Sequence, residues 1–137
     1  MNPTSDDIKT LLEDDSSLGL TFKDNLFVGR QPDGTNAKDN CVTVADTPAA
    51  SPHLGTTTKV SQYYYPSVQI VVRNNDYINA MNLAQNIMES LHGRGNEVVN
   101  STYYALIRCS SGPTPLEWDE NERVNVVVNF ELQRRPQ

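Results

Sequence analysis

The clearest pattern in the chain is a strict alternation of apolar and polar residues near the C-terminus. Apolar side chains occupy every second position, at Val124, Val126, Val128, Phe130 and Leu132, and mostly polar ones lie between them. Because successive side chains of a strand point to opposite faces, this period of two predicts a long strand over residues 122–134 whose apolar row faces the core. Such a strand, roughly 40 Å long if fully extended, would cross the whole domain or project beyond it.

Two segments show the three- and four-residue spacing of apolar side chains that predicts amphipathic helices. The first spans residues 4–14, with Thr4 or Ser5 available to cap its N-terminus. The second spans residues 76–92, with Asp76 as its N-cap and a histidine and a glycine at its end. The apolar stripes are Ile8, Leu11 and Leu12 in the first helix and Ile78, Met81, Leu83, Ala84, Ile87, Met88 and Leu91 in the second.

Four shorter apolar or β-branched runs predict further strands over residues 26–28, 41–45, 66–73 and 103–109. Two intervening segments, 46–62 and 110–121, are rich in turn-forming residues and have no clear period. We expect the first to be a long loop or an extended hairpin arm that becomes ordered in an assembly, and the second to be a connecting loop.

This order of elements predicts an α+β fold. One mixed, mostly antiparallel sheet would carry two helices packed on it, and residues 103–133 would form a long C-terminal β-hairpin with an edge open to a neighbour. The strand–helix–strand step over residues 66–109 is compatible with a crossover connection. With 137 residues and 15.3 kDa, we predict one domain over residues 1–137.

The composition excludes several classes of protein. The net charge is −6 and the pI is near 4.7, which argues against binding of nucleic-acid phosphates through clustered Lys and Arg, although DNA could slide past an acidic wall. No run of 18 apolar residues predicts a membrane helix, and residues 1–7 lack the pattern of a cleaved secretion signal. We therefore expect Cys41 and Cys109 to be reduced, buried thiols, with a disulfide as the alternative.

No pattern predicts a catalytic, cofactor-binding or metal site. Asp119, Glu120 and Glu122 lie next to Trp118 and could serve acid–base chemistry or bind a cation, but a solvated loop is the simpler interpretation. His53 has no serine or cysteine neighbour in a nucleophile motif, which argues against a catalytic triad.

Contacts with other proteins suit several of these residues better. Three consecutive tyrosines could stack on bases or sugars, but the acidic charge of the chain favours an interface role for them. Isolated arginines beside strands suit salt bridges, either within a subunit or between subunits. The candidate interface residues are His53, Lys59, Tyr63, Tyr64, Tyr65, Arg73, Trp118, Asp119, Glu120 and Glu122.

Several stretches of the chain share their sequence pattern with one known protein family. The central stretch is Tyr65-Pro66-Ser67-Val68-Gln69-Ile70-Val71-Val72-Arg73, followed by Tyr77 and a helix that contains Ala80 and Ala84 and ends at Leu91-His92-Gly93. The C-terminal stretches are Asp119-Glu120-Asn121-Glu122-Arg123 and Asn125-Val126-Val127-Val128-Asn129-Phe130, and the N-terminal ones are Leu26-Phe27-Val28-Gly29 and Pro32-Asp33. Together these stretches resemble the tail terminator, or minor capsid, family of tailed bacteriophages. They cover most of residues 20–133, whereas residues 34–62 follow no pattern of the family.

The resemblance implies a small α+β structural virion protein with no enzymatic activity and no cofactor. Proteins of that family form hexameric rings that cap the tail tube, stop its polymerisation and join the tail to the head. The implied partners are further copies of the chain, the tail tube protein and a neck or head-completion protein. The genome would pass through the ring without specific binding, no membrane is involved, and the protein would lie in the tail or neck of the virion after assembly in the host cytoplasm.

Two alternatives stay open. The chain could be a neck or head-completion protein that contacts the portal side of the same virion. It could instead be a small non-viral hydrolase or ligand-binding domain that uses Asp119, Glu120 and His53. A discrete oligomer in solution would favour the virion proteins, and a monomer with a deep pocket around these three residues would favour the hydrolase.

Overall fold

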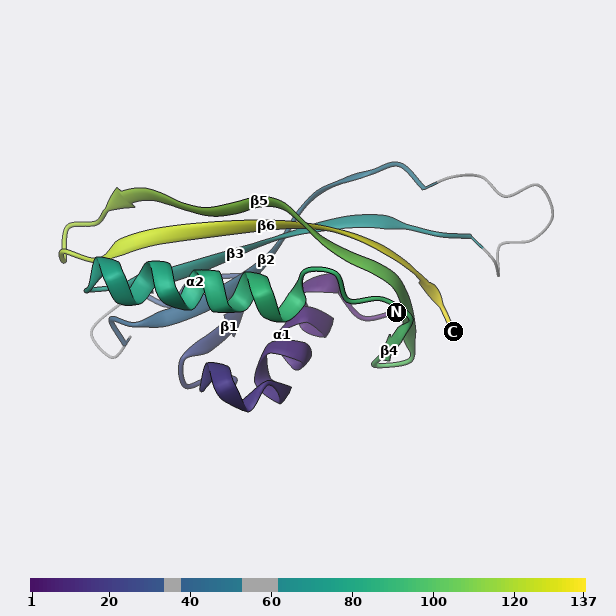
Figure 1. Cartoon of the computed structure of the whole chain (residues 1–137), viewed down its shortest axis with the longest axis horizontal. Coiled ribbons are helices and arrows are strands. Elements are labelled where there is room, and N and C mark those ends of the chain that lie inside the picture. The colour runs from purple at the N-terminus through teal and green to yellow at the C-terminus, as the bar shows by residue number, and fades with distance from the viewer. Residues whose placement is uncertain (34–37, 53–61) are drawn as a thin grey trace.

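The computed structural model describes residues 1–33, 38–52 and 62–137, in which two α-helices pack on one curled sheet (Figure 1). The elements are α1 (Thr4–Asp14), the short 3-10 helix η1 (Ser16–Leu18), β1 (Leu26–Val28), β2 (Cys41–Ala50), β3 (Tyr65–Asn74), α2 (Tyr77–Leu91), β4 (Glu97–Val99), β5 (Thr102–Trp118) and β6 (Val124–Pro136). The predicted α+β fold with two helices on a mixed sheet and a long C-terminal hairpin is confirmed.

The order of the described strands in the sheet is β1-β2-β3-β6-β5-β4, with β1 and β2 parallel and the other neighbours antiparallel. The chain crosses from β3 through α2 to β5, and β6 then lies between these two strands. As a result the β5–β6 hairpin runs along the whole molecule, with its turn at one end and β4 and the C-terminus at the other (Figure 1).

The alternating row of β6 forms the centre of the core. Its five apolar residues, Val124, Val126, Val128, Phe130 and Leu132, are at most 3% exposed, which confirms the predicted register. The strand lies two residues further along the chain than the predicted 122–134. Val127 on the opposite face is also buried, opposite Val71 of β3.

Helix α2 packs on the sheet, but through a different stripe from the one expected. Asp76 accepts a hydrogen bond from the Asn79 backbone N–H and caps the helix as predicted. The fully buried residues are Ala80, Ala84, Ile87 and Leu91. Ile78, which the periodicity assigned to the core, is 62% exposed. Small alanines at the centre of the contact let the helix approach the sheet closely, and this turns Ile78 away from the core.

Helix α1 has the predicted bounds but not the predicted cap. Pro3 occupies the N-cap position, and neither Thr4 nor Ser5 caps the helix from that position. Instead Asp46 of β2 accepts hydrogen bonds from the Ser5 backbone N–H at 3.0 Å and from its hydroxyl at 2.6 Å. A carboxylate from a distant strand therefore satisfies the backbone N–H of Ser5 and lies at the positive end of the helix dipole.

Strand β5 is much longer than predicted. The expected loop over residues 110–121 is wrong, because the strand continues to Trp118. Its pairing with β6 is interrupted by four register shifts, and the turn-forming residues fall in this irregular part. β-bulges absorb the extra residues while β6 still supplies hydrogen-bond partners, so a composition typical of a loop is compatible with a bent strand.

Two more expectations change with the structure. Strand β2 extends past residue 45 to Ala50 and pairs with β3 as far as Tyr65, so of the two alternatives for residues 46–62 the start of the segment agrees with the hairpin arm and not with the loop. Residues 53–61 lie outside the described residues. Both cysteines are free thiols. Cys41 is buried, but Cys109 is only half-buried because it lies on the outer strand β5.

Candidate functional site

The candidate interface residues fall into two groups at opposite ends of the sheet. One group lies at the β5–β6 turn and the neighbouring end of β3 and comprises Arg73, Trp118, Asp119, Glu120 and Glu122. The other comprises Tyr63, Tyr64 and Tyr65, where β3 begins beside the end of β6. His53 and Lys59 lie outside the described residues.

The β5–β6 turn is organised by Asp119 and Arg123. The Asp119 carboxylate accepts hydrogen bonds from the backbone N–H groups of Asn121 and Arg123 and from the Arg123 Nε at 2.8 Å. Desolvation alone would raise the pKa of Asp119, but these hydrogen bonds from Arg123 and Asn121 outweigh it and lower that pKa. A carboxylate held ionised in this way stabilises the turn and is a poor general acid.

Arg73 attaches the loop after β1 to the sheet. It is 2% exposed, and its guanidinium donates to the backbone carbonyls of Pro32 at 2.8 Å, Lys38 at 2.6 Å and Asp39 at 3.2 Å. Arg123 adds a longer contact of 3.5 Å to the Asp39 carboxylate. The expected salt bridge of Arg73 is therefore replaced by a set of carbonyl contacts, which use the guanidinium as a fixed fork of donors.

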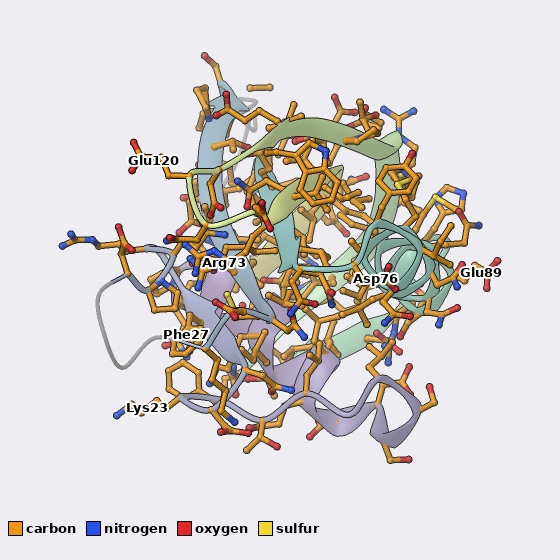
Figure 2. All side chains as sticks on the ribbon, turned by 90° about the vertical axis from the view of Figure 1, so that its left-hand side faces the viewer. Lys23, Phe27, Arg73, Asp76, Glu89 and Glu120 are labelled. Atoms are coloured by element: carbon orange, nitrogen blue, oxygen red, sulfur yellow. The ribbon has the colours of Figure 1, made fainter. Side chains whose placement is uncertain are left out.

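A groove of about 510 Å³ lies between this loop and the turn. Its rim carries the carboxylates of Glu117 and Glu120, and Trp118 is 54% exposed there. Figure 2 shows Glu120 reaching away from the turn, whereas Arg73 lies inside. Among the described residues Glu117, Glu120 and Glu122 form no ion pair, so these three carboxylates are available to an outside cation.

The opposite end of the sheet carries stacked tyrosines and arginines. Tyr64 exchanges two backbone hydrogen bonds with Arg134, which joins the start of β3 to the end of β6. The guanidinium of Arg135 lies 4.5 Å from the ring centre of Tyr103 and 5.9 Å from that of Tyr63. Both distances are typical of cation–π contacts.

A buried polar cluster under the same end ties α1 to the sheet. Tyr104 donates to Oδ2 of Asp7 at 2.5 Å, and the Arg134 guanidinium lies 3.5 Å from the same oxygen. Asn100 donates to Oδ1 at 2.9 Å. Asp7 and Tyr104 are both fully buried. Burial, and then the hydrogen bond to Asp7, raises the pKa of Tyr104 far above its usual range.

The sequence contained a signal for this cluster that composition alone does not reveal. Arg134 continues the inward-facing row of β6, two positions after Leu132. A charged residue in that row must find a buried partner. Asp7, one helical turn before Leu11, supplies it from the apolar side of α1.

The face of the sheet that the helices leave uncovered holds a second groove, of about 530 Å³. Its walls include Pro48, Ala50 and Tyr65 at one side and Leu106 and Arg108 at the other. Glu131 of β6 lies between them and pairs with Arg108. This groove is shallow and mixed in polarity, which suits a contact surface better than a small-molecule site.

Other chemistry has little support in the described part of the chain. His92 accepts a hydrogen bond from the Cys109 backbone N–H at 2.9 Å, so it connects the end of α2 to β5. Within the described residues no three His, Cys, Asp or Glu side chains gather as metal ligands. The described helices are also too short or too polar to cross a membrane.

Comparison with known proteins gives one family match and one similar solved structure. A family model described as "Bacteriophage tail terminator protein" matches residues 8–135. A chain in the solved structure "Virion of native gene transfer agent (GTA) particle" superimposes with a TM-score of 0.66 at 12% sequence identity, covering 96% of this chain and 93% of that one. At that identity the likeness shows a shared fold. No curated protein sequence matches significantly.

Proposed function

The chain belongs to the bacteriophage tail terminator family and is a structural protein of the virion, and from this we propose a specific role. We infer that it forms a closed ring at the end of the tail tube. In this role it stops polymerisation of the tube and presents a second surface to the neck or head-completion proteins. The observation that carries the proposal is the family match over residues 8–135, almost the whole chain. A ring of six copies is the stoichiometry that the family resemblance implies.

The two opposite ends of the molecule support a head-to-tail ring. The β5–β6 turn is acidic, whereas the end near the C-terminus carries Arg135, which has no carboxylate partner among the described residues. Head-to-tail contacts use two different surfaces of each copy, and they close into a ring when the rotation between copies fits. An elongated subunit with chemically different ends is suited to that arrangement.

The sheet edges bear on how copies would meet. Within the described residues, β5 beyond Ile107 pairs only with β6, and this stretch holds Pro113 and Pro115 and most of the register shifts. In the same part of the chain, β2 beyond Val44 pairs with β3 alone, and this stretch holds Pro48. Proline has no N–H, and bulges distort an edge, so both features oppose addition of a neighbouring strand. Along these two stretches we therefore expect side chains to make the contacts between copies, in place of the strand pairing at the hairpin edge that the sequence suggested.

The charge of the chain fits a channel through which DNA passes. A net charge of −6 gives phosphates no strong binding site, which is required if the genome is to move through the ring during infection. Formation and assembly in the host cytoplasm, and a final position at the junction of tail and head, follow from the same role.

The test is a phage in which this gene is inactivated, examined by electron microscopy of the lysate. We expect DNA-filled heads without tails, together with tails of abnormal and uncontrolled length. Tails of normal length that fail to attach would instead indicate the alternative role as a neck protein. Infectious particles would exclude an essential role in the virion. Micrographs of the purified protein test the ring directly.

A further inference from the structure

The end of the sheet near the C-terminus carries an arginine held between two aromatic rings. Arg135 lies over Tyr103 and Tyr63, and the Tyr103 hydroxyl donates to the Asn96 side chain at 2.5 Å, which fixes that ring. Arg135 makes one 3.3 Å hydrogen bond to the Pro136 carbonyl, and among the described residues no carboxylate pairs with it. We call Arg135, Tyr103 and Tyr63 the arginine platform.

The arginine platform has the chemistry of an interface anchor. Arg and Tyr side chains dominate binding energy at protein interfaces, and an anchor that is already ordered loses little entropy when it binds. The planar guanidinium is matched by a carboxylate, which accepts two parallel hydrogen bonds from it. The partner of the platform should therefore be a surface that presents accessible carboxylates.

Such carboxylates lie at the other end of the same hairpin. Glu117, Glu120 and Glu122 at the β5–β6 turn form no ion pair within the described chain, and Trp118 beside them is exposed. Arg135 pairs with Tyr103, whereas Val124 pairs with Trp118, and roughly 35 Å of strand separates these positions on β6. The two surfaces cannot meet within one copy, but they can meet between neighbouring copies.

We propose that the arginine platform of one copy binds the acidic β5–β6 turn of the next copy, with Glu117 and Glu120 as the principal acceptors for Arg135. The partner is thus a second copy of this chain, and the contact is head-to-tail. This inference rests on the proposed ring and names the surfaces that close it. Each copy uses its platform once and its turn once, so in a closed ring every platform and every acidic turn has a partner.

The experiment is a charge exchange read by size-exclusion chromatography with light scattering on the full chain. Arg135→Glu alone, and Glu117→Arg/Glu120→Arg alone, should each raise the concentration needed for assembly at least about tenfold. The two variants mixed in equal amounts should assemble again, because alternating copies restore an attractive pair at every contact. Both changes in one chain should restore assembly as well.

Matched controls separate specific pairing from net charge. Lys23→Glu makes the same charge change as Arg135→Glu, and Glu89→Arg reverses one carboxylate, as each half of the double turn variant does. Both lie at exposed positions away from the turn tip (Figure 2), and they should leave assembly unchanged. Circular dichroism confirms that each variant is folded. If the wild-type chain and the reversed variants all form rings, the proposed pairing is overturned, but the proposed ring is supported. Variants that form rings but fail to join purified tails would assign the platform to another virion protein, which also overturns it. A wild-type chain that stays monomeric even with tail tubes overturns the proposed ring.

Discussion

The hydroxyl of Tyr104 on β5 donates a 2.5 Å hydrogen bond to the carboxylate of Asp7 on α1, and neither side chain reaches solvent. The two residues are 97 positions apart in the sequence. Asn100 and Arg134 complete the surroundings of the carboxylate. This contact fixes the N-terminal helix against the end of the sheet that carries the arginine platform, so its loss should affect both stability and the geometry of that surface.

Tyr104→Phe removes the donor and leaves the shape of the core unchanged. The Asp7 carboxylate would then be buried with one hydrogen bond fewer, and the free energy of unfolding should fall by about 1–3 kcal/mol. Chemical denaturation measures this loss. Tyr103→Phe is the matched control, because that hydroxyl binds Asn96 at an exposed site, and its effect should be clearly smaller. Equal losses in the two variants would show that the buried hydrogen bond stabilises the fold no more than the exposed one.

The same tyrosine predicts the behaviour of the protein in alkali. Burial raises the pKa of Tyr104 in the folded state above its unfolded value of about 10. The folded state therefore keeps a proton that the unfolded state loses, so the stabilisation is complete below pH 10 and declines as the pH rises further. Denaturation midpoints between pH 8 and about 11 test this. The slope above pH 10 should be shallower in Tyr104→Phe than in the wild type.

The register of β6 predicts opposite outcomes at two adjacent positions. Val128 is fully buried, whereas Asn129 lies on the other face and hydrogen-bonds with Gln69 at 3.2 Å. Val128→Asp places a carboxylate in the core without a partner and should reduce stability by at least about 3 kcal/mol. Asn129→Asp should change it by less than about 1 kcal/mol. Thermal unfolding of both variants distinguishes them, and a Val128→Asp protein with wild-type stability would refute the core position.

Patterns carried by neighbouring residues were predicted well, and contacts between distant residues were not. The period of β6 predicted five core positions because alternate side chains of a strand point to the same face of the sheet. The part of β5 after residue 109 was missed because its hydrogen bonds depend on β6, whatever its own composition. The acidic turn was recognised as a cluster in the sequence. The arginine platform was not, because Arg135 and Tyr103 meet only through the register of two strands.

The cap of α1 is a further contact that depends on the tertiary fold, and it predicts a measurable loss. Asp46→Ala removes both acceptors of the Ser5 backbone N–H and hydroxyl. The expected loss is about 0.5–2 kcal/mol, the usual range for deletion of a helix cap. Denaturant titration measures it. Ser5→Ala removes only the hydroxyl and retains the backbone contact, so it should cost less than Asp46→Ala. The reverse order would mean that the backbone contact adds no stability.

Arg73 and Cys41 give a local test of how the loop after β1 is held. The two residues lie directly opposite each other on β3 and β2, and both are almost completely buried. Arg73→Ala removes the donors to three backbone carbonyls and should reduce stability by about 3 kcal/mol. It should also expose the Cys41 thiol. Labelling by a maleimide in a Cys109→Ala background, at a pH where both proteins are folded, should therefore be faster than in the parent. Arg73→Lys keeps the charge but cannot span three carbonyls from one nitrogen, and it should give an intermediate rate. If loss of the side chain left the labelling of Cys41 unchanged, Arg73 would not be what keeps the loop over this thiol.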